Sequence, residues 1–433
     1  MRRYVVPLLL PLVAAAEPAR DGWMPPWIEP GDVPISSAVK SVRVKVRESA
    51  LYQKPGAMDQ RRGTLLRGGY APLFAAQRGP HCAGRWLLVG PSAWLCADEI
   101  EYTSVPFAPP SPPPAMESGL PFEYFFVHGD SASAYASFEG AGDAAPEGDL
   151  DRGFFLPLVE VREKRDGTRW GRTRGGQWIS MSELAPARPL SALGKKIEGG
   201  VLDVAWVRGA KGALVRAQSE AAGSLPASVK LGRAQKTLPR FTEARVQSAS
   251  KSTVEIELPD AAGGAITVTA RAADLSIPTL AAPPAEVRGA DERWIDIELA
   301  SQTLVAYEGK TPIFATLVST GKGAKGSSLA TPPGVFRVWV KLFTSNMDNL
   351  EQELADDYYS IADVPYVQFF HKGVALHAAF WHRDFGHVHS HGCVNLTPED
   401  ARFLYHWTAP HMPAGWDAVL PSVHEKGTVI RVR

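Results

Sequence analysis

The sequence has no excess of charge of either sign, few cysteines and no long apolar run after its first residues. Lys plus Arg number 46 and Asp plus Glu number 46, so the formal net charge is zero with neutral His. Nucleic-acid binding needs a basic surface, so we expect no nucleic-acid partner. The cysteines, Cys82, Cys96 and Cys393, are too few for a disulfide scaffold or a four-cysteine zinc site.

Glycine and proline are abundant instead, with 39 and 36 residues in a chain of 433. This composition favours short strands and turns over a helical bundle. Apolar residues make up 45% of the chain, which is enough for a packed core. Because the length exceeds what one hydrophobic core usually organises, we expect several domains of mainly β structure.

The first residues have the order of features that is typical of a secretory signal peptide. Arg2 and Arg3 precede the apolar run 4–13, and Ala14–Ala16 follow it. We therefore expect residues 1–16 to be a signal peptide and the protein to be exported to the periplasm or cell envelope. No later stretch of 18 apolar residues occurs, so we expect no integral membrane span after signal removal.

Export would place Cys82 and Cys96 in an oxidising compartment. The segment between them, Trp86–Trp94, is typical of a hairpin that turns at Gly90-Pro91 and brings the two cysteines roughly opposite each other. A disulfide between them and two buried free thiols are both compatible with the sequence. Cys393 is left over, and a lone thiol in an exported protein is a candidate reactive group.

A weak internal repeat precedes the C-terminal region. Arg85-Trp86 with Trp94 recurs 84 residues later as Arg169-Trp170 with Trp178, and a fainter third copy ends near Ala273-Asp274-Leu275. The two tryptophan patterns resemble bacterial Src-homology-3-like domains. The resemblance implies small β-barrel modules that bind the wall or a peptide, or that only space the catalytic domain. The tryptophans also fit the cores of small barrels. We expect modules at 38–106, 120–190 and 200–280, with a Pro-rich linker at 107–119.

The C-terminal region has clear β patterns and one helix signal. Residues 294–299 and 303–307 alternate with period two around a Ser301-Gln302 turn, and 312–318 follows as a third strand. Thr397 suits an N-cap, Pro398 the first helical position, and Asp400 a capping box. These signals predict a short helix that ends at Trp407, directly after the segment that contains Cys393.

Chemistry-bearing residues concentrate just before this helix. Six of the 11 histidines lie between His371 and Cys393, at positions 371, 377, 382, 387, 389 and 391. A thiol needs a base, because the thiolate is the nucleophile. His391 is two residues away, and His377 ends an apolar strand-like run. The backbone N–H groups of Gly392 and Cys393 are candidates for an oxyanion hole.

The segment Ser390-His391-Gly392-Cys393-Val394-Asn395, with His377 upstream, resembles the motif of the L,D-transpeptidase catalytic domain. The resemblance covers 292–433 and implies a β-sandwich with short helices. It implies that Cys393 is the nucleophile, that His377 transfers protons while the Ala378 carbonyl orients its ring, and that His391 supports the thiolate. Ser390 holds the loop, and Asn395 takes the place of the motif's Asn or Arg. We expect both Ser390 and Asn395 to bind the substrate. The sequence departs from the family pattern at Ala378, often Gly, and at the unassigned His387 and His389.

The family chemistry is attack on a peptidoglycan tetrapeptide stem, release of D-Ala and formation of a thioester, which a second stem resolves as a 3→3 cross-link. Wall or outer-membrane protein amines are other acceptors, and water would make the enzyme an L,D-carboxypeptidase. No cofactor or metal is needed. Among the aromatic residues near the site, Tyr366 and Trp381 are candidates for lining the substrate groove. A metal site of histidines and Cys393, and a non-catalytic wall-binding protein, are the alternatives from other functional classes.

Overall fold

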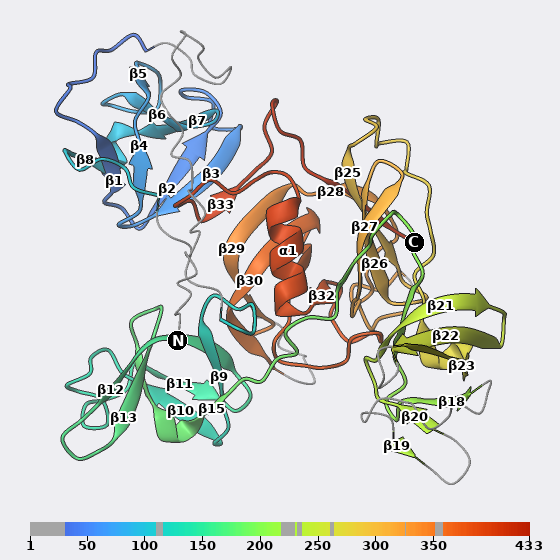
Figure 1. The fold of residues 1–433 in the computed structure, drawn as a ribbon. Coiled ribbons are helices and arrows are strands. Elements are labelled where there is room, and N and C mark those ends of the chain that lie inside the picture. The colour runs from blue at the N-terminus through green and yellow to red at the C-terminus, as the bar shows by residue number, and fades with distance from the viewer. Residues whose placement is uncertain are drawn as a thin grey trace, which may run out of the picture. The chain divides into compact units, whose positions relative to one another are not determined.

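The chain is mainly β, as expected, with α1 as the α-helix of the described residues (Figure 1). The computed structural model describes residues 31–109, 116–217, 230–231, 236–259, 264–324, 326–350 and 358–433. The described residues up to Phe107, except Arg62–Leu66, form one compact unit, and Arg62–Leu66 with the residues from Ala108 onward form a second. The predicted signal peptide (1–16) and positions 110–115 of the predicted linker lie outside the described residues.

The first unit consists of short strands around a small aromatic core. The ring of Tyr52 packs edge-on against Trp86, with centroids 5.7 Å apart, and Tyr52 pairs with Trp94 across the sheet. Both tryptophans are buried, so they serve as core residues. The elements of the first unit are β1 (Ser41–Val44), β2 (Glu48–Tyr52), β4 (Tyr70–Pro72), β5 (Ala75–Gln77), β6 (Trp86–Gly90), β7 (Ala93–Cys96), η1 (Ala97–Glu99) and β8 (Ile100–Thr103). Strand β3 (Arg61–Leu66) belongs, except for Arg61, to the second unit.

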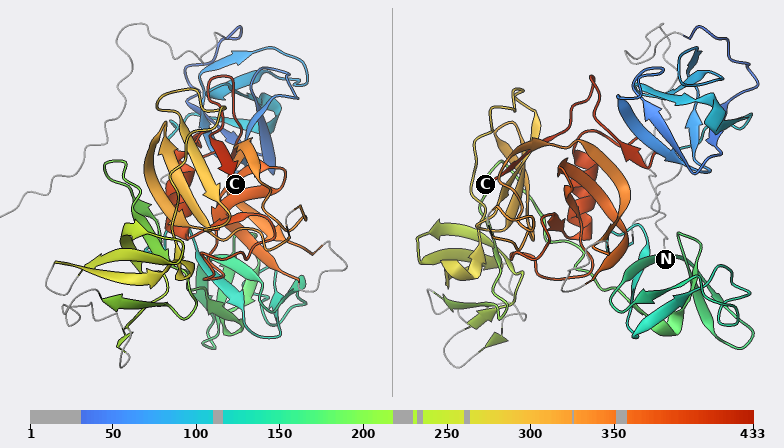
Figure 2. Two further views of the ribbon diagram at one scale, coloured as in Figure 1. Left: turned by 90° about the vertical axis from the view of Figure 1, so that its right-hand side faces the viewer. Right: turned by 180° about the vertical axis from the view of Figure 1, so that it is seen from behind.

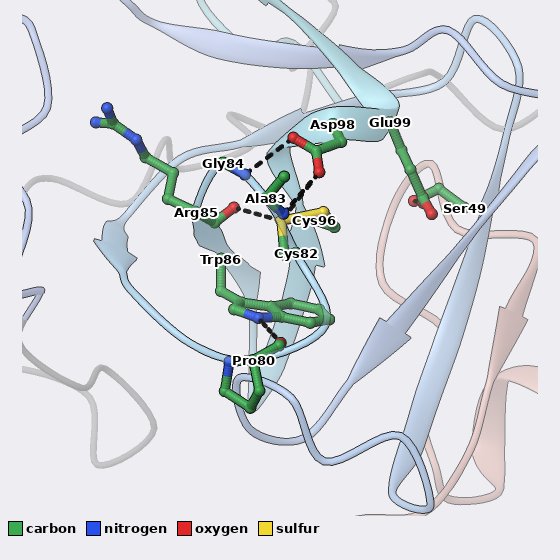
Figure 3. The surroundings of a disulfide bond; sticks show 10 residues. All are labelled: Ser49, Pro80, Cys82, Ala83, Gly84, Arg85, Trp86, Cys96, Asp98 and Glu99. Atoms are coloured by element: carbon green, nitrogen blue, oxygen red, sulfur yellow. Dashed lines mark hydrogen bonds between the residues drawn. A yellow bond between two sulfur atoms is a disulfide. The ribbon is translucent and has the colours of Figure 1, made fainter.

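A disulfide joins Cys82 to Cys96, with Cα atoms 5.6 Å apart (Figure 3). The expected β6–β7 hairpin is present, but Cys96 pairs with Trp86 across it, so Cys82 reaches Cys96 from the preceding loop rather than from the opposite strand position. The Asp98 carboxylate accepts the N–H groups of Ala83 and Gly84, at 2.9 and 3.1 Å. These hydrogen bonds hold the loop against the end of β7.

The next stretch repeats the Tyr–Trp–Trp arrangement of the first unit. Tyr135 packs edge-on against Trp170, with centroids 5.6 Å apart, and pairs with Trp178. Both tryptophans are again buried. The assignment of these stretches to Src-homology-3-like domains stays a prediction. The elements are β9 (Glu123–Val127), β10 (Ser131–Ala134), β11 (Gly148–Asp151), β12 (Phe155–Glu163), β13 (Arg169–Thr173), β14 (Trp178–Ser180), η2 (Met181–Glu183) and β15 (Leu184–Pro186).

The third stretch ends like the first two. In each, a 3-10 turn leads into a short strand whose first residue is buried: Ile100, Leu184 and Leu275. The described elements are β17 (Val204–Val207), β18 (Ala213–Ala217), β19 (Lys230–Leu231), β20 (Lys236–Leu238), β21 (Glu243–Ala249), β22 (Thr253–Pro259), β23 (Ala265–Arg271), η4 (Ala272–Asp274) and β24 (Leu275–Ser276).

The C-terminal region contains two sheets. One has the strand order β16-β27-β26-β25-β34-β28, and the other contains β29, β30, β31 and β32 in sequence, with β33 paired to β29. The expected hairpin is β25–β26, and the third strand is β27. The elements are β16 (Lys195–Lys196), β25 (Arg293–Glu298), β26 (Thr303–Glu308), β27 (Thr311–Leu317), β28 (Gly334–Arg337), β29 (Val340–Asp348), β30 (Ser360–His371), β31 (Val374–Ala378), β32 (Val394–Leu396), α1 (Pro398–Trp407), β33 (Ala418–Val419) and β34 (Val429–Val432).

Helix α1 lies between these two sheets, as Figures 1 and 2 show. Its buried Leu404 and Tyr405 share one apolar cluster with Ile295 of β25 and Leu376 of β31. The helix runs from Pro398 to Trp407, as predicted, but Asp400 does not form the expected capping box. Its carboxylate accepts the N–H groups of Leu193 and Gly194 and the hydroxyl of Thr316, because the preceding chain passes over the start of the helix.

The disulfide closes a short loop, because its cysteines have a sequence separation of 14. Replacing both residues, as Cys82→Ser with Cys96→Ser, is expected to lower the unfolding free energy of the first unit by about 3 kcal/mol, because the unfolded chain regains loop entropy. Urea unfolding of the full chain measures this change. Reduction of the unsubstituted protein must give the same loss, and equal stability of the reduced and oxidised forms would contradict the prediction.

Candidate active site

The site is built on the parallel pairing of β31 with β32. Leu376 lies beside Val394, and His377 beside Asn395. Side chains alternate between the two faces of a strand, and Leu376 and Val394 both point into the cluster that contains α1. His377 and Asn395 therefore point to the opposite face. Cys393, two positions before Asn395, lies on that face as well, where it packs against the cluster that contains Ala375 and Phe380.

Cys393 is half-buried and is a free thiol. Its Sγ lies 3.7 Å from the Gly373 carbonyl oxygen, on the turn between β30 and β31. Burial raises the pKa of the Cys393 thiol, and the backbone N–H of Ala375 partly offsets this by stabilising the thiolate. In the resting protein at neutral pH, Cys393 is thus a protonated thiol that needs a base before it can attack a substrate.

His377 offers that base. Its side chain is 2% exposed, and Nδ1 lies 3.0 Å from the Ala378 carbonyl oxygen, so Nδ1–H is the donor and Nε2 keeps its lone pair. Burial lowers the pKa of His377 to about 4. The ring stacks on Trp381 at a centroid distance of 5.7 Å. His377 is therefore a neutral imidazole in a fixed tautomer, able to accept a proton at Nε2.

His391 is exposed, and its ring stacks on Tyr359 at 5.2 Å. Partial burial lowers the pKa of His391, and the nearby charges of Lys322 and His389 lower it further. Burial, and next the charge of Cys393, raise the pKa of the Tyr359 hydroxyl. Tyr359 and Cys393 pack against the same apolar cluster. Tyr359 is one of the aromatic residues that the sequence places near the site, although it was not among the two candidates for the substrate groove.

The loop before Cys393 is held by hydroxyl groups. Ser390 Oγ donates to the Cys393 carbonyl oxygen at 2.5 Å and accepts the Gly392 N–H at 3.1 Å. Thr331 Oγ1 donates to the Gly392 carbonyl oxygen at 2.8 Å. Gly392 has a φ of +123°, which side chains strain to adopt. Ser390 Oγ therefore occupies the Gly392 N–H, one of the two candidate donors for an oxyanion hole.

Asn395 is buried and is not on the surface where it could touch a substrate. Its amide nitrogen lies 2.7 Å from His382 Nε2, while His382 Nδ1 accepts the Asp384 N–H at 3.1 Å. A neutral His382 then carries its proton on Nε2, which needs an acceptor. Turning the amide by 180° brings its oxygen, which otherwise has no partner in the described residues, to this N–H. Asn395 thus links His382 to β32, contrary to the expected substrate contact.

The two residues that were predicted to line the substrate groove differ in their burial and contacts. Tyr366 is 3% exposed, and its hydroxyl donates to the Gly119 carbonyl oxygen at 2.9 Å, so it is a core residue and the prediction that it lines a groove is wrong. Trp381 is half-buried against His377. Its contact with substrate stays a prediction.

The six clustered histidines do not form one site. His387 Nε2 lies 2.9 Å from the Arg208 carbonyl oxygen, on the third β stretch. His389 Nδ1 lies 3.1 Å from the Asp384 carboxylate, and its ring is 4.1 Å from that of His382. His371 stacks on Phe336, away from this group. Of these six histidines, only His382 and His389 come together with an acidic group among the described residues.

Residues of the 120–190 stretch complete the apolar surface next to Cys393. Leu120 and Tyr124 are buried in the cluster against which Cys393 packs. The Tyr124 ring lies 4.0 Å from that of Phe380, and its hydroxyl donates to the Asp363 carbonyl oxygen at 2.5 Å. The surface behind the thiol therefore depends on side chains that come from outside 292–433.

The comparisons identify the C-terminal region. Residues 292–432 match the sequence profile of the family described as YkuD, L,D-transpeptidase catalytic domain, which confirms the family predicted for this part of the chain. A search of the curated proteins found no match.

Solved structures of L,D-transpeptidases are similar to parts of this chain. A mutant of the Enterococcus faecium enzyme is 23% identical, with a TM-score of 0.25, over 33% of this chain and 50% of its own. The similarity to the Mycobacterium smegmatis enzyme has 16% identity and a TM-score of 0.27, over 64% of this chain and 99% of that chain. The chain thus spans half the length of the enterococcal structure.

The raised pKa of Cys393 predicts slow alkylation at neutral pH. The rate with iodoacetamide should rise about tenfold per pH unit above pH 7 and keep rising past about pH 8.5, the usual thiol pKa, because only the thiolate reacts. Mass spectrometry of the non-reduced protein measures it, with the urea-unfolded chain as the control. A rate already constant near pH 7 would show a resting thiolate–imidazolium pair and contradict the prediction.

Tyr124 should contribute strongly to the stability of the site. Tyr124→Ala is expected to cost about 3–5 kcal/mol, because it removes a buried ring that packs on Phe380. Amide hydrogen exchange in β30 and β31 reports the loss directly. Glu123→Ala, the exposed neighbour, is the matched control and should change stability by less than about 0.5 kcal/mol. Equal exchange in both variants would mean that this stretch does not support the site.

Proposed function

We propose that this protein is a peptidoglycan L,D-transpeptidase that acts through a thioester on Cys393. The observation that carries the proposal is the placement of Cys393 and a neutral, oriented His377 on one face of two paired strands. This pair lies within the region that matches the L,D-transpeptidase catalytic domain. The substrate class, peptidoglycan stem peptides, follows from that family.

In the first half-reaction, Cys393 Sγ attacks the carbonyl carbon of the third residue of a tetrapeptide stem. His377 Nε2 accepts the thiol proton as the C–S bond forms, which removes the obstacle set by the raised thiol pKa. The tetrahedral intermediate then collapses. The bond to D-Ala breaks, the leaving nitrogen takes the proton back from His377, and a thioester remains on Cys393.

In the second half-reaction, an amine attacks the thioester carbonyl. His377 accepts a proton from the amine and returns it to the departing sulfur, which restores the thiol. A second stem as acceptor gives a 3→3 cross-link, and a wall or outer-membrane protein amine gives an attached protein. Water would give an L,D-carboxypeptidase.

Other groups in the site assist this chemistry. With the Gly392 N–H bound to Ser390, the proposal assigns the oxyanion to the Cys393 N–H, the other donor expected from the sequence. The ring of His391 stacks on Tyr359, and the proposal assigns it the role of supporting the thiolate as it forms. Trp381 lines the approach of the substrate beside His377.

The substrate implies the cellular location. A cell-wall enzyme acts outside the cytoplasm, and we assign residues 1–16 as the signal for export to the periplasm or cell envelope. In the described ranges, no helix has the length and apolarity needed to cross a membrane. The β stretches before the catalytic region are proposed to bind wall material or to space that region from its neighbours.

The central experiment incubates the full chain with a disaccharide-tetrapeptide and resolves the products by mass. A dimer that has lost one D-Ala is expected, together with a protein adduct at Cys393. A trimmed tripeptide alone would assign the carboxypeptidase reaction, and unchanged substrate would reject the enzyme.

Variants test the assigned roles. Cys393→Ala should abolish both product and adduct, and His377→Gln should lower the rate by about 10²–10⁴-fold through loss of proton transfer. The matched control is His424→Gln, which changes an exposed histidine and should leave the rate unaltered. Cross-linking by the Cys393→Ala protein would disprove the thioester mechanism.

A further inference from the structure

Three side chains beside the site form a group that the proposed reaction does not use. His382, Asp384 and His389 each offer one ligand atom, and these atoms lie within 4.8 Å of one another. His389 Nδ1 is 3.1 Å from an Asp384 carboxylate oxygen, and the two imidazole rings are 4.1 Å apart. Two imidazoles and a carboxylate are a common ligand set for zinc.

The buried member of the group has the support that a metal ligand needs. Metal-bound histidines usually donate their second ring N–H to a fixed acceptor, which sets the tautomer. His382 Nε2 faces the buried Asn395 amide at 2.7 Å, so Nδ1 is the nitrogen available to a metal. Binding would replace the hydrogen bond that Nδ1 accepts from the Asp384 N–H.

The other two ligands can move to the ion. Zinc–nitrogen and zinc–oxygen bonds of about 2.0–2.2 Å require donor atoms about 3.3 Å apart, so these side chains need to shift by about 1 Å. The side chains of Asp384 and His389 are 49% and 39% exposed, which leaves room for this movement.

A nearby positive charge limits the affinity of this group for a metal ion. Arg240 Nη1 lies 3.6 Å from Asp384 Oδ1 and opposes a cation at this position. The other carboxylate oxygen, Oδ2, lies 3.1 Å from His389 Nδ1. The arrangement thus leaves one carboxylate oxygen for the ion and one for the guanidinium.

The geometry points to a zinc site formed by His382 Nδ1, Asp384 Oδ2 and His389, with water as the fourth ligand. The ion ties the 382–389 loop to Asn395 of β32, two residues from Cys393. It does not include the thiol. This inference does not depend on the proposed transpeptidase reaction, and it gives a role to His389, for which the family pattern offers none.

Cobalt is the spectroscopic probe and zinc the competing ion. Titration of the chelator-treated full chain with Co²⁺ should give visible d–d bands of a nitrogen–oxygen site, with no thiolate-to-cobalt band in the near ultraviolet. Zn²⁺ should displace the cobalt at one ion per chain and raise the melting temperature, because it binds only the folded state. Cys393→Ser should leave the spectrum unchanged.

Substitutions locate the site. His389→Ala and Asp384→Asn should each weaken Co²⁺ binding more than about 100-fold, and Asn395→Ala about 10–100-fold through loss of the supporting hydrogen bond. His387→Ala, in the same loop but bonded to the Arg208 carbonyl oxygen, is the matched control and should bind normally. Circular dichroism checks that each variant folds.

Three outcomes would overturn the inference. These are no Co²⁺ or Zn²⁺ binding by the unsubstituted chain, undiminished binding by the His389→Ala protein, and a thiolate band that disappears in the Cys393→Ser protein. The last result would instead place the metal on the catalytic thiol. The first two outcomes leave the result of the cross-linking assay unchanged, so the two proposals fail separately.

Discussion

The parallel pairing of β31 with β32 is the constraint on which the rest of the site depends. Because successive side chains of a strand point to opposite faces of the sheet, these two short strands have two different faces. Leu376 and Val394 anchor one face in the core beneath α1, while His377 and Cys393 share the other. A shift of either strand by one residue would bury the thiol under the helix and expose the core side chains. The apolar residues of the motif are therefore as necessary to the proposed chemistry as the polar ones.

Local signals in the sequence predicted much of the framework. The alternation in 294–307 corresponds to the β25–β26 hairpin, and the Thr397-Pro398 pair marks the start of α1. The 84-residue repeat of tryptophans corresponds to two equivalent Tyr–Trp contacts. Features of this kind are encoded within a few residues, or within one hairpin, so pattern and spacing are sufficient to find them. The segment with His377 and Cys393 was identified for the same reason, by a continuous motif.

Tertiary contacts explain why the structure differs from the sequence-based expectations at three residues of the site. Tyr366 was expected at a groove, but Gly119, far away in the chain, accepts its hydroxyl inside the core. Asn395 was expected to meet a substrate, but it bonds to His382. The Gly392 N–H was a candidate for the oxyanion hole, but it donates to the hydroxyl of Ser390. In each case a hydrogen-bonding group has a partner that amino-acid composition and hydrophobic periodicity cannot identify. Buried polar groups form hydrogen bonds, and the tertiary fold determines which partner lies near them.

The contribution of Leu120 and Tyr124 to the apolar cluster behind Cys393 has a consequence for how such proteins diversify. Proteins of several domains are often described as a catalytic domain joined to an exchangeable binding domain. Here a recombination breakpoint between 190 and 292 would separate Tyr124 from Phe380. It would remove Tyr124 from the apolar cluster against which Cys393 packs. The ancestry of the two segments should therefore be shared, and their phylogenies should branch together.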